Sequence, residues 1–110
     1  METPNNTQIG KFIHLVTLNC KDEQHAKQCL SALANYGKPD ALSYNCLSYE
    51  FGRKANSKNT VYLIERWSKW KDLDLLLNDK VIPALSMYNQ LLKNPFNPET
   101  DTLRIELSNV

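Results

Sequence analysis

One segment near the N-terminus, Phe12 to Cys20, restricts the fold more than any other part of the chain. It reads Phe-Ile-His-Leu-Val-Thr-Leu-Asn-Cys, which is almost continuously apolar and rich in β-branched and aromatic residues. A run of this kind is typical of a strand that is covered on both faces. We therefore predict a central strand of a sheet, in which His14 points to the same side as Val16 and Leu18.

The residues after this strand predict where a helix begins and ends. Asp22 is expected to act as the N-cap, because its short side chain accepts hydrogen bonds from the first free backbone N–H groups. The predicted apolar face of this helix consists of Ala26, Cys29, Leu30 and Leu33. Gly37 is expected to end the helix in a left-handed conformation, and Pro39 is expected to prevent its continuation.

Two further strands are predicted in the middle of the chain. The first covers roughly Ser43 to Arg53, where apolar and polar residues alternate. The polar stretch that follows is long enough only for a hairpin connection. The second strand covers Val61 to Trp67, and the alternation puts Glu65 and Trp67 on one side and Arg66 on the other.

The C-terminal part predicts a broken helix and a last strand. Ser68 is expected to cap the helix, and Asp79 is expected to cap a second piece after a break at Asn78. Pro83 fits the first turn of this second piece, where its missing N–H costs least. After a proline-containing loop at 94–98, a strand is predicted at 102–107.

The predicted order of elements is β-α-β-β-α-β, which indicates an α+β, ferredoxin-like fold with one antiparallel sheet and helices on one face. The last strand has Leu103 and Ile105 on one side and Arg104 on the other. An open sheet face with such leucine, isoleucine and aromatic residues is expected to pack against a second copy in a homodimer. We expect one domain over residues 1–110, with its core at about 12–107 and a polar tail at 1–10.

Charge and cysteine content exclude several classes of protein. Thirteen Lys and Arg residues against twelve Asp and Glu residues give a formal net charge of +1, so neither nucleic acid nor a membrane surface is a predicted partner. Cys20, Cys29 and Cys46 match neither a redox pair nor a zinc framework. They are predicted to be buried thiols of a cytoplasmic protein, although a Cys–His catalytic pair with His14 or His25 stays open.

Three segments of the chain resemble the antibiotic biosynthesis monooxygenase family. They are residues 14–18 (His-Leu-Val-Thr-Leu), 46–53 (Cys-Leu-Ser-Tyr-Glu-Phe-Gly-Arg) and 65–67 (Glu-Arg-Trp). The helix with Leu73 and Asp74 is also similar to that family's, and the resemblance extends over nearly the whole chain. It implies a dimeric α+β barrel that holds a ligand pocket between the sheet and the helices of each subunit.

Members of this family include cofactor-independent oxygenases that convert anthrones or quinols to quinones, and relatives that degrade haem. Many members carry histidines in the helix after Glu-Arg-Trp, at positions that match Leu76 and Val81 here. Haem-degrading members have a tryptophan near Leu76 and a haem-binding histidine near Ser86, so haem degradation is not expected. The glycine that commonly precedes Cys-Leu-Ser is Asn45 in this chain.

The candidate site residues follow from side-chain chemistry and strand direction. His14 is predicted as the catalytic base because histidine titrates near neutral pH, although a hydrogen-bonded core histidine is the alternative. Trp67 is the second predicted catalytic residue because its indole N–H suits a substrate oxygen, although it also suits the core. Glu65 and Arg66 are interpreted as structural, with Glu65 as a hydrogen-bond acceptor. The predicted substrate-binding residues are Tyr44, Tyr49, Tyr62, Tyr88 and Leu76.

The function predicted from these features is that of a cofactor-independent monooxygenase acting on a quinol- or anthrone-like aromatic or a polyketide intermediate in secondary metabolism. Its task is to remove a proton so that the substrate anion reduces O₂ directly, and no metal or cofactor is predicted. Two alternatives stay open. One is a non-oxidative cyclase, isomerase or decarboxylase of a polyketide- or terpenoid-like intermediate. The other is a small-molecule binder without catalysis.

Overall fold

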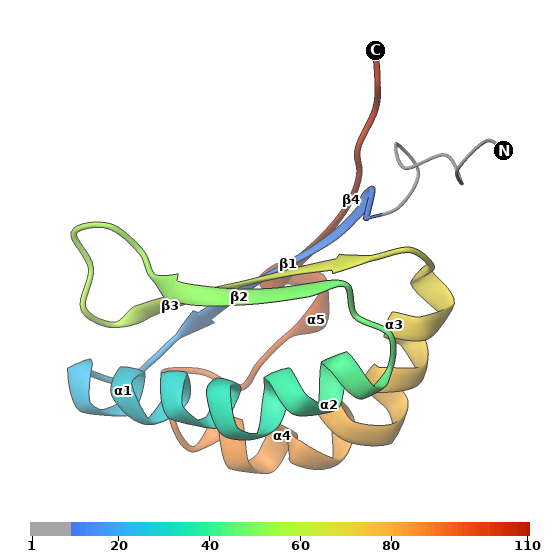
Figure 1. The fold of residues 1–110 in the computed structure, drawn as a ribbon. Helices are drawn as coiled ribbons and strands as arrows, with labels where there is room; N and C mark the ends of the chain where they lie inside the picture. The colour runs from blue at the N-terminus through green and yellow to red at the C-terminus, as the bar shows by residue number, and fades with distance from the viewer. Residues whose placement is uncertain (1–9) are drawn as a thin grey trace, which may run out of the picture.

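The computed structural model describes residues 10–110, in which one antiparallel sheet carries the long helices on a single face (Figure 1). The strands are β1 (Phe12–Asn19), β2 (Ser48–Arg53), β3 (Thr60–Trp67) and β4 (Thr102–Glu106). The α-helices are α1 (Glu23–Ala32), α2 (Lys38–Ser43), α3 (Trp70–Leu76), α4 (Ile82–Asn89) and α5 (Pro98–Asp101). Two π-helical turns, η2 (Leu33–Gly37) and η3 (Leu77–Val81), join α1 to α2 and α3 to α4. The predicted polar tail lies outside the described residues apart from Gly10.

The sheet has the strand order β2-β3-β1-β4, and every pair of neighbours is antiparallel. The predicted central strand is confirmed, because β1 pairs with β3 on one side and β4 on the other. In this register His14 has Glu65 as its neighbour on β3 and Arg104 as its neighbour on β4. The α+β, ferredoxin-like architecture predicted from the order of elements is therefore confirmed.

The core lies between the sheet and the helices. The strands contribute buried side chains to this core, which are Val16 and Leu18 of β1 and Val61, Leu63 and Trp67 of β3. Each such side chain contributes about 1.5–3 kcal/mol to the free energy of unfolding by leaving water. None of the helices within residues 10–110 is long and apolar enough to cross a bilayer.

The three cysteines are buried and free, as predicted. Burial raises the pKa of the Cys29 thiol to about 12 and that of Cys46 to about 11. A thiol with such a pKa is not a thiolate nucleophile at neutral pH. The ring Nδ1 atoms of His14 and His25 contact carboxylates, Glu65 and Asp22 respectively, so the structure gives no support to a Cys–His pair.

Asp22 caps α1 as predicted, but the prediction that this helix ends at Gly37 is wrong. The carboxylate of Asp22 accepts a hydrogen bond from the backbone N–H of His25 at 2.8 Å. Gly37 has a right-handed φ of −61°, and the helix continues through η2 into α2. Pro39 lies in the first turn of α2, where its missing N–H does not interrupt a required hydrogen bond. Gly37 serves another purpose, since a Cβ there would collide with the hydroxyl group of Tyr49.

Because the first long helix continues to Ser43, β2 begins at Ser48 and not at Ser43 as predicted. Asn45 turns the chain between them with a left-handed φ of 72°. Asparagine is among the few residues that adopt this conformation readily, so Asn45 makes this turn at small cost. Within β2 the predicted alternation is confirmed, because Tyr49 is buried and Glu50 is exposed.

The second long helix also differs from its prediction. Its N-cap is Lys69 rather than Ser68, and no side chain caps it. The predicted break at Asn78 is replaced by η3, and Asp79 accepts a hydrogen bond from the hydroxyl of Tyr44 at 2.7 Å instead of capping a new helix. Pro83 does lie in the first turn of α4, as predicted. The short helix α5, which precedes β4, was not predicted.

We predict that Gly37→Ala destabilises the protein by about 1–3 kcal/mol, because the added methyl group overpacks the contact with buried Tyr49. Urea unfolding measures this change. Gly52→Ala is the matched control, since a Cβ at Gly52 meets nothing within 4 Å. Adding Tyr49→Phe to Gly37→Ala removes the colliding hydroxyl and is expected to restore part of the loss. A loss that Tyr49→Phe leaves unchanged would contradict this explanation.

Candidate functional site

A cavity of about 340 Å³ lies between the sheet and the helices, on the side of β1 where His14 points. Its lining comes from all four strands, from both π-helical turns, and from the helices α2, α3, α4 and α5. Most of the lining is apolar, as expected for a small-molecule site. The polar and charged residues that line it are His14, Tyr36, Asp40, Tyr49, Glu65, Lys80, Tyr88, Glu99, Thr102 and Arg104.

A buried histidine–carboxylate pair forms part of this lining. Nδ1 of His14 lies 2.7 Å from Oε1 of Glu65, and the two residues are 5% and 4% exposed. The antiparallel register of β1 and β3 brings them together, because they are directly opposed residues with side chains on the same face. A polar pair is tolerated at this depth because the two side chains satisfy each other through one hydrogen bond.

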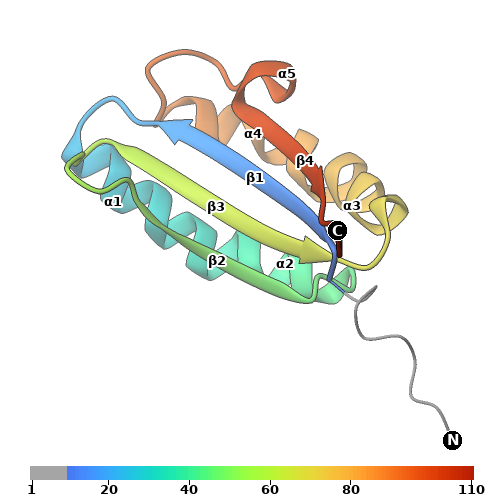
Figure 2. The ribbon, with the colours of Figure 1, turned by 90° about the horizontal axis from the view of Figure 1, so that it is seen from above.

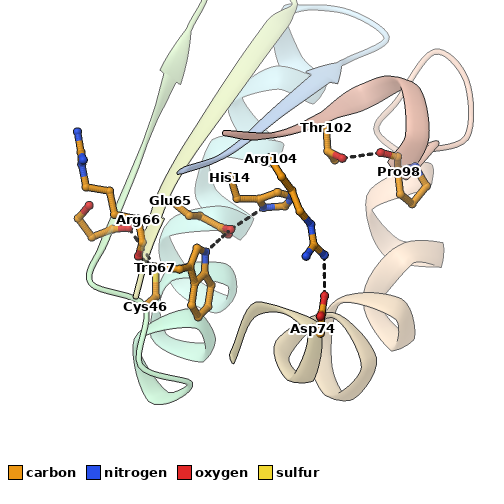
Figure 3. Close-up of polar contacts among 10 residues, drawn as sticks. His14, Cys46, Glu65, Arg66, Trp67, Asp74, Pro98, Thr102 and Arg104 are labelled. Carbon is orange, nitrogen blue, oxygen red and sulfur yellow. Dashed lines mark hydrogen bonds and ion pairs between the residues drawn. The ribbon is translucent and has the colours of Figure 1, made fainter. Parts of the chain in front are cut away.

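Trp67 completes a chain of three side chains (Figure 3). Its indole Nε1 donates a hydrogen bond of 3.1 Å to the same oxygen, Oε1 of Glu65. Since this oxygen already accepts the indole hydrogen, we assign it as the acceptor from His14 too, which puts the hydrogen of the imidazole on Nδ1. Nε2 of His14 has no hydrogen-bond partner within residues 10–110 and is therefore the nitrogen available to a bound molecule.

Arg104 places a cation beside this pair. It is the β4 neighbour of His14, and its guanidinium donates a hydrogen bond of 2.6 Å to Oδ1 of Asp74 on α3. The guanidinium also lies 5.1 Å from the centre of the Trp70 ring, within the range of a cation–π contact. Glu65, His14 and Arg104 therefore follow one another across three adjacent strands on the cavity side of the sheet (Figure 3).

Tyr49, Tyr88 and Leu76, three of the predicted substrate-binding residues, do line the cavity. Burial raises the pKa of Tyr88 to about 12 and raises the pKa of Tyr49 further. Both phenols are therefore protonated at neutral pH and can donate a hydrogen bond.

Tyr44 and Tyr62 were also predicted to bind substrate, but the structure places them outside the lining. The hydroxyl of Tyr44 donates to Asp79, which raises the pKa of that phenol. Tyr62 is the β3 neighbour of Thr17, whose side chain points to the open face of the sheet. The sequence already indicated this position for Tyr62. Tyr62 and Glu65 are three residues apart on the same strand, and residues an odd number apart point to opposite faces of a sheet.

The structure places Trp67, the second predicted catalytic residue, outside the cavity lining. Its side chain is fully buried, it does not line the cavity, and its N–H is already bonded to Glu65. Trp67 therefore holds Glu65 in place, in line with the alternative interpretation that it belongs to the core. Glu65, interpreted as structural, accepts hydrogen bonds as expected and in addition lines the cavity.

Sequence reasoning missed four charged residues of the lining, which are Asp40, Lys80, Glu99 and Arg104. For Arg104 a signal existed, because the alternation of the last strand put it on the side opposite Leu103. The other three lie on helices, where only the packing of α2, η3 and α5 decides which residues face the cavity. No group of three or more potential metal-ligating side chains was found among residues 10–110.

The sequence matches no protein-family model and no curated protein. Solved structures do match. A monooxygenase from the ActVA-Orf6 gene of Streptomyces coelicolor, determined with bound nanaomycin D, has a TM-score of 0.73 at 12% identity over 96% of this chain and 94% of its own. A candidate antibiotic biosynthesis monooxygenase from Deinococcus radiodurans has a TM-score of 0.72 at 16% identity over 90% and 94%.

The chain has the fold of these monooxygenases. A dimeric ferredoxin-like protein from an uncultured marine organism shares it as well, with a TM-score of 0.69 at 7% identity over 94% of this chain and 93% of its own. The resemblance to antibiotic biosynthesis monooxygenases noted in the sequence is thus confirmed at the level of the fold. Identities this low leave activity and substrate to be argued from the site itself.

We predict that Glu65→Leu destabilises the protein by about 2–4 kcal/mol, because it leaves the buried donors of His14 and Trp67 without an acceptor. Urea unfolding followed by tryptophan fluorescence measures the loss. Glu65→Gln, which keeps an oxygen at this position, is the matched control and is expected to lose clearly less. Equal stability of Glu65→Leu and the wild type would show that these hydrogen bonds do not hold the site together.

Proposed function

We propose that the protein is a cofactor-independent monooxygenase that oxidises a quinol- or anthrone-like aromatic, or a related polyketide intermediate. The observation that carries this proposal is the His14–Glu65 pair on the wall of an otherwise mostly apolar cavity. A base in such surroundings suits the removal of a proton from an electron-rich aromatic. The fold shared with a monooxygenase that binds nanaomycin D supports the same class of substrate.

The proposed reaction begins when Nε2 of His14 takes a proton from the substrate. Glu65 acts as a positioning residue, because its carboxylate fixes the ring and favours the imidazolium that forms. The resulting carbanion gives electrons to O₂, a carbon–oxygen bond forms, and the proton held by His14 passes to the peroxide to give a hydroperoxide. His14 then removes the second hydrogen of the same carbon as the O–O bond breaks. One oxygen stays as the new carbonyl group, and the other leaves as hydroxide, which takes this proton from His14 and becomes water. The phenols of Tyr49 and Tyr88 are the candidate donors to the substrate oxygen.

A non-oxidative cyclase, isomerase or decarboxylase is the second candidate. It also passes through a substrate carbanion or enolate, formed by loss of a proton or, in a decarboxylase, of CO₂. The cation of Arg104 beside His14 favours this candidate, because it suits a developing enolate. The candidates differ in how the anion reacts: it reduces O₂ in the monooxygenase, takes a proton in an isomerase or decarboxylase, and attacks a carbonyl carbon of the same molecule in a cyclase. The experiment must therefore follow oxygen and product together.

We predict that the wild type consumes O₂ with a reactive anthrone or hydroquinone without added metal or flavin, and that His14→Ala lowers the turnover about 10²–10⁴-fold. An oxygen electrode and mass spectrometry of the product measure both. His25→Ala, which removes a surface histidine bonded to Asp22, is the matched control and is expected to keep full turnover.

Other outcomes would assign the protein differently. Product formation at unchanged oxygen would favour the non-oxidative candidate. Unchanged turnover in His14→Ala would remove His14 as the base. Ligand binding without turnover of any kind would favour the binder alternative.

We also propose that two copies associate through the open face of the sheet. Figure 2 looks onto this face, which no helix covers. The register brings Leu103 of β4, Leu15 of β1 and Ile64 of β3 into one row across the sheet. Ile13 and Ile105 form a second pair on the same face, two residues further along the strands. Leu103 and Ile64 are 60% and 41% exposed, so a partner sheet would remove much apolar area from water. The shared fold with a dimeric ferredoxin-like protein supports the homodimer.

We predict that Ile105→Glu weakens this dimer about thirtyfold or more, because it buries a charge in the centre of an apolar contact. Light scattering after size-exclusion chromatography gives the mass of the assembly over a dilution series. Leu42→Glu on α2, also an exposed apolar residue but on the helical side, is the matched control. A monomeric wild type, or an effect of Leu42→Glu alone, would contradict the proposed interface.

Four further expectations complete the proposal. We propose a cytoplasmic location, which fits three free buried thiols, and a role in secondary metabolism. We propose one domain over residues 1–110 with its core at about 12–107. The near-balanced charge supports small molecules rather than nucleic acid as partners.

A further inference from the structure

Arg104 is a charged residue of the cavity that the proposed reaction does not require. Its side chain points to the cavity from β4, one strand away from His14, and it is the neighbour of His14 in the ladder. A guanidinium on the strand next to the base is placed to meet a group that the substrate carries close to the atom that loses its proton. The question is which chemical group it would bind.

The present partner of Arg104 shows what this position accepts. Asp74 places a carboxylate oxygen 2.6 Å from one guanidinium nitrogen, and the two side chains are 38% and 54% exposed. An ion pair as exposed as this contributes little to stability, so a second carboxylate can replace or share it at small cost. The guanidinium has further N–H donors in a planar fork that matches a carboxylate.

The guanidinium is held in position by its surroundings. It lies against the ring of Trp70, which in turn stacks on Phe12 at 5.0 Å and donates a hydrogen bond of 2.8 Å to Glu106. A cation fixed in this way loses less side-chain entropy when it binds an anion. Lys80 adds a second positive charge to the lining, while Asp40 and Glu99 add negative ones from α2 and α5.

We infer that the cavity takes an aromatic hydroxy acid, whose carboxylate is bound by Arg104 while its hydroxyl group or ring carbon faces His14. This inference rests on the proposed function, since it assumes that the cavity is the substrate site. In the free protein the carboxylate of Asp74 is paired with the guanidinium of Arg104, so it competes with the substrate carboxylate for the same donors. Arg104 is thus a specificity-determining residue, and Asp74 sets how strongly it binds acids.

The test is equilibrium binding of an ortho-hydroxynaphthoic acid and of its methyl ester, followed by ligand fluorescence, which needs no turnover. The wild type is expected to prefer the acid about ten- to hundredfold, as a charge-assisted hydrogen bond implies. Arg104→Gln is expected to lose this preference and to bind the ester as before. Asp74→Asn is expected to bind the acid several-fold more tightly, because the competing carboxylate is gone.

Several results would overturn the inference. Equal binding of acid and ester by the wild type would do so, as would a preference that survives Arg104→Gln. Loss of the preference in Lys80→Gln alone would assign the acid to Lys80, and weaker acid binding by Asp74→Asn would make the Arg104–Asp74 pair merely structural. Arg53→Gln, an arginine outside the lining, is the matched control. Failure of both ligands to bind would instead reject the proposed site itself.

Discussion

The carboxylate of Glu65 lies between two other buried side chains, those of His14 and Trp67. The geometry of the site depends on the two hydrogen bonds that it accepts from them. Its Oε1 atom accepts hydrogen bonds from Nδ1 of His14 and from Nε1 of Trp67. A carboxyl group that is 4% exposed is costly to bury without such partners. The two bonds fix the ring of His14 and leave Nε2 for a ligand. The same oxygen atom of Glu65 therefore links the core residue Trp67 to the candidate base His14, so the hydrogen bonds that stabilise the core also position the base.

The two π-helical turns are the second feature that shapes the cavity. Each precedes a proline in the first turn of the next helix, so each long helix changes its hydrogen bonding just where Pro39 or Pro83 could not supply an N–H. Both turns line the cavity, and Tyr44 links the two long helices through Asp79 beside them. Turns of this kind often occur at functional sites, where they turn side chains toward a ligand. Here they bring Tyr36 and Lys80 to the lining.

Predictions from the sequence were most accurate where one residue type decides the local structure. The apolar run of β1, the cap at Asp22 and the alternation in β3 were all confirmed, because burial and capping act within a few residues. Predictions failed where tertiary contacts override a local signal. Gly37 indicated a helix end, yet it lies inside a continuing helix. The position needs glycine because the hydroxyl of Tyr49 occupies the space that a Cβ would need. Asp79 has a good capping side chain but does not cap, because the helix that buries Leu73 and Leu76 against the core continues through η3. Ser68 does not cap either, because the helix begins one residue further along with Lys69 as its N-cap.

The sequence by itself determined the order of the strands and the two long helices, the neighbours on its own strand with which His14 or Glu65 shares a side, and the apolar character of both faces of β1. These properties depend on the two-residue period of a strand, which is local. Only the tertiary structure decided that His14 and Glu65 are opposed across the ladder, that Arg104 follows them, and that Trp67 is bonded inside the core. Strand register and helix packing set these distances. Both result from contacts between segments as much as 90 residues apart, such as His14 and Arg104, and no local pattern records them.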